Sequence, residues 1–285
     1  MLGLASRRRR GFAEPITPRT ESLLIVTPTV GVSPWLAETV AGVATLAVAR
    51  RHVLVSPETA VQALKARFPH TLVVPEAANG GGMYAAINAG SNVVVDWDWL
   101  TWINDDDCLR PGFGELWRRA QAAPAAADVW YGEVDYVGPE GGKLAAMPVC
   151  RRPADVPALL ASGLAPFTQQ GALISRDLWR RLGGMDASLR IAGDFDFWIR
   201  AAASGARFRF VPGTVAAYRM RPGQLSGGVT RARQEEEAVL RRCDLAVGRA
   251  RRWMASVRFR AENLPRIIQR AWRTGRLRSR QMYAR

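Results

Sequence analysis

The stretch Ser22-Leu-Leu-Ile-Val-Thr27 decides the fold, because it is a continuous apolar run bounded by Pro28. Strands of a parallel sheet are buried on both faces, so their sequences are unbroken apolar runs. The pair Ser33-Pro34 follows, with a capping residue before proline at the first helical position, and predicts a helix over residues 35–51. This strand and helix form the first unit of an alternating pattern.

The alternation continues outward from this unit to residue 107. Further strands are predicted at three apolar runs, His52-Val-Leu-Val55, Thr71-Leu-Val-Val74 and Trp99-Leu-Thr-Trp-Ile103. Helices are predicted between them, after Ser56-Pro57-Glu58 and over residues 83–89. Alternating strands and helices are joined by right-handed crossovers, so the predicted fold class is α/β, with a mostly parallel, doubly wound sheet.

The second half is more irregular. Residues 111–123 are a predicted helix, and two strand-like runs are predicted within 129–149, around the turn Gly138-Pro139-Glu140-Gly141-Gly142. The remaining predictions are helices after Arg176 and over 194–204, strand-like runs at 208–211 and 215–218, and an arginine-rich helical region from Thr230 with a break at Asn263-Leu264-Pro265.

The composition of the 285 residues is that of a folded protein, with 48% hydrophobic and 23% charged residues. The net charge of +15 is concentrated at the two ends of the chain. Residues 11–230 hold 20 basic and 20 acidic residues, whereas residues 231–285 hold 16 arginines against five acids. A neutral body argues against nucleic acid as a partner. No apolar window is long enough to span a membrane and no secretory signal is evident, so we expect a cytoplasmic protein.

Three consecutive aspartates, Asp105, Asp106 and Asp107, follow the fourth predicted strand. Ligands of doubly wound sheets bind at the carboxyl ends of the strands. Neighbouring carboxylates raise one another's pKa unless a cation lies nearby, and Mg²⁺ and Mn²⁺ favour carboxylate together with phosphate oxygens. The triplet therefore indicates a metal-held nucleotide diphosphate, or else a solvated acidic turn that caps the next helix.

A second candidate group is Gly193-Asp194-Phe195-Asp196-Phe197-Trp198-Ile199-Arg200. In a helix, Asp194 and Asp196 would lie about 200° apart and could not face one site together. Asp196 stands four residues before Arg200, which predicts a structural ion pair. Asp194 is either a helix N-cap or a general base for an acceptor hydroxyl.

Arg219 and Arg221 form a third group, in a polar loop after a predicted strand. Guanidinium groups match phosphate oxygens, so the two residues are either phosphate ligands or part of a charged surface loop.

In their order and spacing, these motifs resemble a family 2 glycosyltransferase with the GT-A fold, a Rossmann-like α/β architecture, over about residues 22–226. The similar segments are 22–29, 76–90, 103–107, 169–176, 183–186, 193–200, 218–219 and 224–226. The chain departs from the family at Ser56 and Glu58, which stand where an aspartate commonly reads the nucleobase, and at Gln169, where histidine is frequent.

The resemblance implies an inverting transfer of sugar from a nucleotide-diphosphate donor to an acceptor hydroxyl, with Mn²⁺ or Mg²⁺ as cofactor. It implies that Asp107 is the metal ligand, that Asp106 contacts the ribose or sugar of the donor, and that Asp194 is the catalytic base. Substrate contacts are also expected from the other motif residues, Thr27, Pro28, Thr29, Ser56, Glu58, Gly82, Tyr84, Asn88, Asp105, Gln169, Gln170, Arg219 and Arg221.

The expected organisation is a basic lead (1–20), a catalytic domain (21–228) and a basic amphipathic helical tail (229–285). Within the catalytic domain, residues 21–110 would bind the nucleotide sugar and residues 111–228 the acceptor. An arginine-rich amphipathic helix can lie on an anionic membrane surface, so residues 249–285 predict peripheral attachment to the inner face of the cell membrane. The alternatives are that this face packs on the catalytic domain or binds a partner.

Polysaccharide or glycolipid synthesis at the cell surface would suit a sugar, glycan or lipid-linked acceptor. Two other functions are weighed against transfer. A nucleic-acid-binding protein could act through its arginine-rich tail. A nucleotidyltransferase could use a similar sheet, although the sequence has no P-loop.

Overall fold

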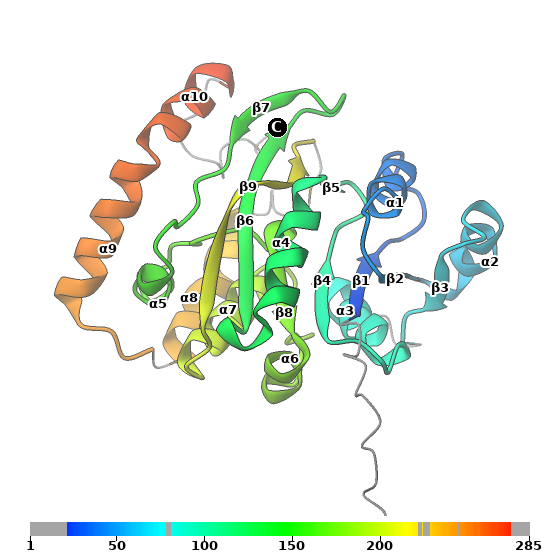
Figure 1. Ribbon diagram of the computed structural model, residues 1–285, viewed down its shortest axis with the longest axis horizontal. Helices are drawn as coiled ribbons and strands as arrows, with labels where there is room; N and C mark the ends of the chain where they lie inside the picture. Colours follow the sequence, from blue (N-terminus) through cyan, green and yellow to red (C-terminus); the bar gives the residue numbers. More distant parts are fainter. Residues whose placement is uncertain (1–21, 78–80, 222–223, 225–228, 244, 275–285) are drawn as a thin grey trace, which may run out of the picture.

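The structure is a computed structural model that describes residues 22–77, 81–221, 224, 229–243 and 245–274. The predicted lead (1–20) and the end of the tail (275–285) lie outside these residues. The described strands are β1 (Leu23–Pro28), β2 (Arg50–Ser56), β3 (Leu72–Pro75), β4 (Trp99–Trp102), β5 (Cys108–Leu109), β6 (Val129–Val137), β7 (Lys143–Ala146), β8 (Ala172–Ser175) and β9 (Phe208–Arg219). They form one sheet in the order β3-β2-β1-β4-β8-β6-β9-β5, with β7 beside β6 (Figure 1).

The first four strands are parallel, as the alternation predicts. Strand β1 pairs with β2 on one side and with β4 on the other, and β2 pairs with β3. All six residues of β1 are buried, which explains the unbroken apolar run. Because these strands run in one direction, the segments that follow their carboxyl ends gather at one edge of the sheet.

Antiparallel pairing begins at β8, which pairs with both β4 and β6. The two strand-like runs predicted at 208–211 and 215–218 are one long strand, β9, whose pairing with β6 shifts register in the middle. Near its end, β9 pairs with the short strand β5, where Ala217 lies opposite Cys108. This pairing brings the end of β9 beside the aspartate triplet.

Ten helices are described, namely α1 (Leu36–Ala44), α2 (Glu58–Arg67), α3 (Gly82–Val93), α4 (Gly112–Ala122), α5 (Val156–Leu160), α6 (Arg176–Leu182), α7 (Gly193–Ala203), α8 (Val229–Arg242), α9 (Arg249–Glu262) and α10 (Leu264–Thr274). Helices α1 and α2 lie at one end of the molecule in Figure 1, and α9 and α10 at the other. The predicted break of the tail falls at Asn263, between α9 and α10. The α/β fold class with a helical arginine-rich extension is confirmed.

The helix predicted over 35–51 is too long. Helix α1 ends at Ala44, where the guanidinium of Arg50 donates to the carbonyls of Ala44 and Leu46, both at 2.5 Å. Arg50 itself is the first residue of β2 and pairs with Leu23. Local helix propensity is overridden here by strand pairing.

The predicted N-cap role of Ser33 is also wrong. Helix α1 has Trp35 at its N-cap position and no side-chain cap. The hydroxyl of Ser33 donates instead to the carbonyl of Asp105 at 2.8 Å. The residue that local sequence marks as a cap therefore holds the loop after β4 in place.

An aromatic cluster packs α6 and α7 against the sheet. Trp102 of β4 stacks on Trp198 with ring centroids 6.1 Å apart, and meets Phe197 edge-on at 6.5 Å. Trp179 of α6 joins the same cluster, 5.3 Å from Phe197. Packed aromatic pairs of this kind stabilise a core beyond their buried area. They place helix α7, which carries Asp194, on the sheet strand that precedes the aspartate triplet.

Candidate active site

Asp105 lies at the rim of the strand edge and is partly buried. Its Oδ2 accepts a hydrogen bond of 2.6 Å from the hydroxyl of Thr29, the residue that follows β1. Burial raises the pKa of Asp105, and the Thr29 bond opposes that rise. Two residues that the sequence predicts to contact substrate thus meet across neighbouring parallel strands.

Asp106 is 5% exposed and forms an ion pair. Its Oδ2 accepts from Nε of Arg221 at 2.7 Å, and Nε2 of Gln224 lies at 3.4 Å from the same oxygen. The side chain of Arg221 is 28% exposed, so this guanidinium lies at the surface of the site. The structure brings together two of the predicted substrate-binding residues, one acidic and one basic.

Asp107 is 1% exposed, and three N–H donors surround its carboxylate. The backbone N–H of Arg219 donates to Oδ1 at 2.8 Å, while the side-chain amides of Gln170 and Asn104 donate to Oδ2 at 2.7 and 3.1 Å. Burial and the charge of Asp106 raise the pKa of Asp107 to about 8, which these three bonds oppose. Asp107 thereby joins the end of β4 to β9 and to the 3-10 turn Gln169–Gly171.

The side chain of Arg219 lies inside the protein, at 1% exposure. Its Nε donates to the Asp106 carbonyl at 2.9 Å and its NH2 pairs with Glu38 at 2.5 Å, and NH1 donates to the carbonyls of Gly138 and Pro139. The sequence predicts that Arg219 and Arg221 are either phosphate ligands or part of a charged surface loop. In the structure Arg219 is bonded to the protein, so Arg221 is the more accessible cation.

Trp35 is a residue of this site that sequence reasoning missed. Its ring lies beneath both guanidinium groups, with the Arg219 and Arg221 Cζ atoms each 5.5 Å from the ring centroid. Its indole N–H donates to the Pro139 carbonyl at 3.0 Å. Cation–π contacts of this geometry hold the two arginine side chains in place. The sequence marked Trp35 only as the start of a helix.

The predicted residues on β1 and β2 are buried at the same edge. Thr27 is fully buried, and its hydroxyl lies 2.9 Å from Nε2 of His52. Ser56 is also fully buried, whereas Glu58 is exposed at the start of α2. Pro28 is the last residue of β1. Among these residues, Glu58 is the one that offers an exposed polar side chain.

Gln169 and Gln170 are both buried, in the 3-10 turn that precedes β8. Gln170 bonds Asp107, as described above. The buried Oε1 of Gln169 has no hydrogen-bond partner among the described residues. Buried polar atoms are ordinarily paired, so this oxygen is available for a ligand group that donates a hydrogen bond.

Asp194 lies at the first turn of α7 and is partly buried. Burial, followed by the charge of Glu236, raises its pKa to about 6, and the backbone N–H of Phe195 opposes this by donating to Oδ1 at 2.8 Å. The helix has Ala192 at its N-cap position and no side-chain cap, so Asp194 is not the cap. A carboxylate with a pKa near 6 can accept a proton at neutral pH.

Asp196 is fully buried and has the predicted structural role. Its Oδ2 accepts from Nε of Arg200 at 2.7 Å, the ion pair expected from the spacing of four residues. Its Oδ1 accepts from NH2 of Arg242 on α8 at 2.6 Å. Asp196 therefore ties α7 to α8.

Residues predicted to line the donor pocket on α3 instead bond the segment before α7. The hydroxyl of Tyr84 donates to the Ile191 carbonyl at 2.6 Å, and a Cβ on Gly193 would lie 2.5 Å from the Tyr84 ring. The amide of Asn88 bonds both backbone groups of Met185 at 2.9 Å. Tyr84 and Asn88 thus hold the backbone that leads to Asp194.

The start of α3 lies beside the same segment. Gly82 has a φ of 76°, a left-handed value, and a Cβ there would come within 3.1 Å of the Arg190 guanidinium. Gly82 therefore lets the first turn of α3 approach the loop that precedes α7.

Glu235 of α8 is a second residue that the sequence did not reveal. Its Oε2 accepts from the backbone N–H groups of Ile191 at 2.8 Å, Ala192 at 3.0 Å and Arg190 at 3.1 Å. Although burial opposes it, these bonds and the one from Arg231 lower the pKa of Glu235. Glu235 stands in a run of three glutamates on an arginine-rich helix, a context that suggests only a solvated face.

The turn 105–107 has the chemistry of a Mn²⁺ or Mg²⁺ site. These ions take carboxylate oxygens and commonly complete their shell with phosphates and water, so one or two carboxylates suffice. Among the residues that the structure describes, no three His, Cys, Asp or Glu side chains are grouped as a metal cage. The donor set fits an ion shared with a bound diphosphate.

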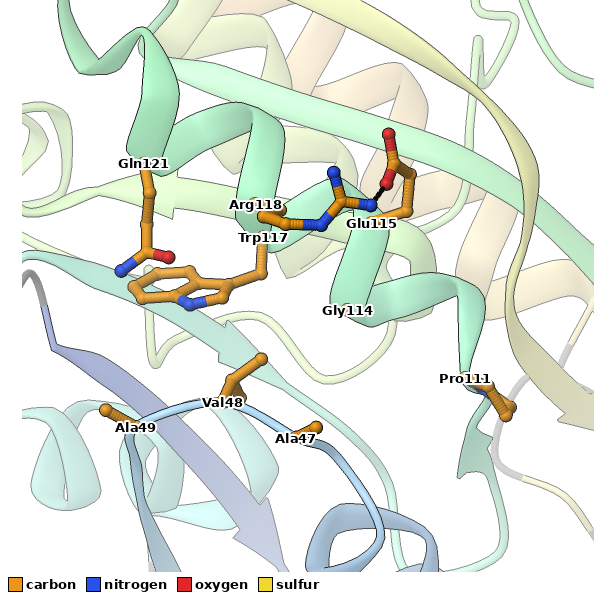
Figure 2. A pocket seen from close by; sticks show the side chains of 9 residues that line it. All are labelled: Ala47, Val48, Ala49, Pro111, Gly114, Glu115, Trp117, Arg118 and Gln121. Carbon is orange, nitrogen blue, oxygen red and sulfur yellow. Dashed lines mark ion pairs between the residues drawn. The ribbon is translucent and has the colours of Figure 1, made fainter.

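Figure 2 shows a hollow between the α1–β2 connection and α4. An ion pair between Arg118 and Glu115 lies at its rim. None of the predicted site residues lines this hollow, whose walls are formed by Ala47, Val48, Ala49, Pro111, Gly114, Glu115, Trp117, Arg118 and Gln121.

Solved structures with a similar fold are glycosyltransferases. TarS of S. aureus (residues 1–349) is 14% identical, with a TM-score of 0.55, over 86% of this chain and 72% of that one. Glucosyl-3-phosphoglycerate synthase of Mycobacterium tuberculosis, solved with Mn²⁺ and UDP, is 16% identical, with a TM-score of 0.52, over 85% and 88%. The mannosyltransferase PcManGT of Pyrobaculum calidifontis, solved with GDP-Man and Mn²⁺, is 15% identical, with a TM-score of 0.50, over 87% and 76%. The fold is the GT-A fold.

A sequence comparison matches part of the chain to a family model. Residues 157–284 match the family model described as glycosyl transferase family group 2. The match covers 128 of the 285 residues, and together with the shared fold it confirms the resemblance to a family 2 glycosyltransferase. A comparison with curated proteins found no match. Among the described helices, none has the length and apolar character that a bilayer crossing requires.

Proposed function

We propose that this glycosyltransferase moves a sugar from a nucleotide-diphosphate donor to an acceptor hydroxyl with inversion, in polysaccharide or glycolipid synthesis. The observation that carries the proposal is the aspartate turn 105–107, at the carboxyl edge of a GT-A sheet, with Arg221 paired to Asp106 at 2.7 Å. Acidic and basic groups at one edge suit a diphosphate and its metal ion. Two similar structures were solved with Mn²⁺ together with GDP-Man or UDP, which supports this donor class.

The turn 105–107 would hold Mn²⁺ or Mg²⁺. When bound, the ion would neutralise charge on the leaving diphosphate. Asp107 is the ligand that the resemblance implies, and its Oδ1 accepts only one of the three N–H bonds described above. Asp105 and Asp106 supply further carboxylate oxygens in the same turn, and Arg221 would add positive charge beside the diphosphate.

Asp194 would act as the base that removes the proton of the acceptor hydroxyl. That oxygen would attack the anomeric carbon from the face opposite the departing nucleoside diphosphate, so the configuration inverts. The partly buried carboxylate, with its pKa near 6, supports this role. The proposal requires Asp194 and the turn 105–107 to face one cleft.

The donor would contact the residues buried around the strand edge. Thr29 and Asp105 form a hydrogen bond there. The Oε1 of Gln169, which has no partner among the described residues, would accept a hydrogen bond from a hydroxyl of the sugar donor or of the acceptor substrate. Trp35 and Arg221 present a flat, cationic surface to a nucleotide. Glu58 is exposed and could accept a nucleobase N–H. Residues 249–285 would attach the protein peripherally to the inner face of the cell membrane.

Incubation with a panel of nucleotide sugars and Mn²⁺ tests the reaction class. Release of nucleoside diphosphate with a labelled sugar on the acceptor fraction is the expected result. Asp194→Asn and Asp105→Asn proteins serve as matched controls for contaminating activity. Release of pyrophosphate would instead favour a nucleotidyltransferase, and no turnover with tight, salt-sensitive RNA binding would favour a nucleic-acid-binding protein.

A further inference from the structure

Helices α9 and α10 carry large apolar side chains on their solvent side. Trp253 is 69% exposed and Val257 45%, and on α10 Leu264 is 52%, Ile268 57% and Trp272 82% exposed. Within each helix these residues are four apart, so they lie on one face. Only Asn263 separates the two helices, which follow one another along one edge of the molecule in Figure 1. We call these five residues the outer face.

The side of these helices that packs on the body is a mixture of apolar and polar residues. Ala255, Ser256, Asn263 and Arg270 are buried there, at 2%, 8%, 2% and 6% exposure, and Phe259 packs partly buried against the core. The side-chain amide of Asn263 accepts from the N–H of Val149 at 3.0 Å and donates to its carbonyl at 3.1 Å. A helix that covers a soluble domain normally buries its apolar stripe and exposes its polar face. Helices α9 and α10 instead leave their largest apolar side chains, Trp253 and Trp272, exposed to solvent.

Specific polar contacts fix this orientation. Arg258 forms an ion pair of 2.8 Å with Asp155, on the segment before α5. Arg266 pairs with Glu133 of β6 and also donates to the Met147 carbonyl at 2.8 Å. Because these bonds anchor the two helices on the body, the five residues of the outer face stay exposed to solvent.

Exposed arginines border the outer face. Arg249 precedes Trp253 by four residues, Arg260 follows Val257 by three, and Arg273 follows Trp272 directly. All three are exposed. The surroundings are basic as well, since residues 231–285 hold 16 arginines against five acids. A second copy seated on the same face would bring like charges together, because a two-fold interface pairs each patch with itself. A partner surface that complements the outer face and its arginines would be both apolar and negatively charged.

We propose that the outer face of α9 and α10 lies on an anionic lipid bilayer. Its apolar side chains would enter the boundary between headgroups and acyl chains, with the tryptophans at the level of the headgroups and the bordering arginines on lipid phosphates. This inference does not depend on glycosyl transfer. The tail would contact the membrane through two folded helices, α9 and α10, whose orientation is fixed by their contacts with the body.

Flotation of the full chain with lipid vesicles tests the proposal. Vesicles of phosphatidylcholine with phosphatidylserine are compared with vesicles of phosphatidylcholine alone. We expect binding to the anionic vesicles, a loss of about tenfold or more in Trp253→Ser/Trp272→Ser, and a weaker preference for anionic lipid in Arg249→Glu/Arg260→Glu. The matched control is Leu72→Ser/Val95→Ser, which removes two exposed apolar side chains (46% and 69%) elsewhere and should bind like the unaltered chain.

Three results would overturn the proposal. One is failure of the unaltered chain to float with anionic vesicles. Another is equal binding by the double tryptophan variant and the control. The third is a dimer in light scattering that the tryptophan changes dissociate while vesicle binding persists, which would make the outer face an interface between copies. Thermal unfolding of every variant checks that these exposed substitutions leave the fold intact.

Discussion

Three neighbouring aspartates after β4 have three different environments. Asp105 is partly buried and bonded to Thr29, and Asp106 is paired with Arg221. Asp107 is enclosed by three N–H donors. Consecutive side chains at a strand end point in different directions, so each meets a different part of the fold. Identical residues can therefore serve binding and structure within one turn.

Asp107→Asn should lower stability. The substitution turns one buried acceptor into an N–H donor that faces other donors, and an unpaired buried polar group costs about 1–3 kcal/mol. We expect the midpoint of thermal unfolding to fall by a few degrees. Asp105→Asn is the control, because Asp105 is partly exposed and its Thr29 bond can persist. An unchanged unfolding midpoint with complete loss of Mn²⁺-dependent nucleotide binding would mean that Asp107 is a metal ligand without this structural role.

The base assignment of Asp194 predicts a pH dependence. Transfer should decline as the pH falls through about 6, the pKa to which burial and Glu236 raise this carboxyl. Asp194→Asn should lower kcat by about 10²–10⁴-fold and leave nucleotide binding nearly unchanged. The measurements are kcat/KM from pH 4.5 to 8 and nucleotide affinity. Full turnover by Asp194→Asn would contradict the assignment of Asp194 as the catalytic base.

The same substitution should not destabilise the fold at neutral pH. The folded-state pKa of about 6 lies above the ordinary 3.8, so ionised Asp194 lowers stability above pH 6. As the pH falls from 6 to 4 the carboxyl becomes protonated in the folded state and this loss disappears. Asp194→Asn should therefore unfold at an equal or higher temperature at pH 7.5, with a difference that vanishes near pH 4.

At the scale of elements, the start of α7 is held from two sides. Tyr84 of α3 bonds the Ile191 carbonyl, and Glu235 of α8 accepts three backbone N–H groups from residues 190–192. The carboxylate of Glu235 is also stabilised by the positive end of the α7 helix dipole, because it lies at the N-terminus of that helix. Helices distant in the sequence thus fix the backbone that carries Asp194.

Glu235→Ala should impair catalysis through the position of Asp194. Without the three bonds the segment before α7 can shift, and a displacement of about 1 Å can cost roughly 10²-fold in rate. We expect a lower kcat with little change in the KM for the donor. Glu235→Gln should recover part of the rate, since the amide oxygen still accepts N–H bonds.

Glu237→Ala is the matched control for this prediction. Glu237 lies on the same helix, is 48% exposed and pairs with Arg233 at 2.9 Å. Its loss should leave kcat unchanged. If Glu235→Ala and Glu237→Ala were equally active, or if Glu235→Ala raised KM alone, Glu235 would have no role in positioning the base.

At the scale of the whole molecule, one sheet joins the two halves of the predicted catalytic domain. Strands β1 to β4 supply the parallel edge, and β9 returns from the second half to pair with β5 beside Asp107. The neutral body carries this edge, whereas the basic helices α9 and α10 lie at the opposite end from α1 and α2 (Figure 1). The proposed substrate site is formed by loops at the edge of the sheet, and the proposed membrane contact by α9 and α10.

Nucleoside diphosphate with Mn²⁺ should stabilise the whole fold. A ligand that binds only the folded state adds about 2.7 kcal/mol at a concentration 100 times its Kd, or several degrees in the unfolding midpoint of a chain of this size. Chelation of the metal should abolish the shift, which differential scanning calorimetry measures. Equal stabilisation with and without Mn²⁺ would contradict a metal-held diphosphate.

The sequence by itself determined the alternating first half of the fold. Short apolar runs bounded by proline or polar residues, as at β1 and β2, favour buried strands, and the break at Asn263-Leu264-Pro265 ends a helix for local reasons. The ion pair of Asp196 with Arg200 also follows from spacing on one helix. Patterns that depend on neighbours in the chain are visible in the sequence.

Only the tertiary structure decided which residues, distant in the sequence, contact one another at the site. Ser33 bonds Asp105 instead of capping α1, Arg219 is buried beside Asp107, and Glu235 holds the approach to Asp194. Each of these contacts joins residues more than 40 positions apart. Side-chain direction in such contacts depends on how strands and helices pack, so neither composition nor spacing can reveal it.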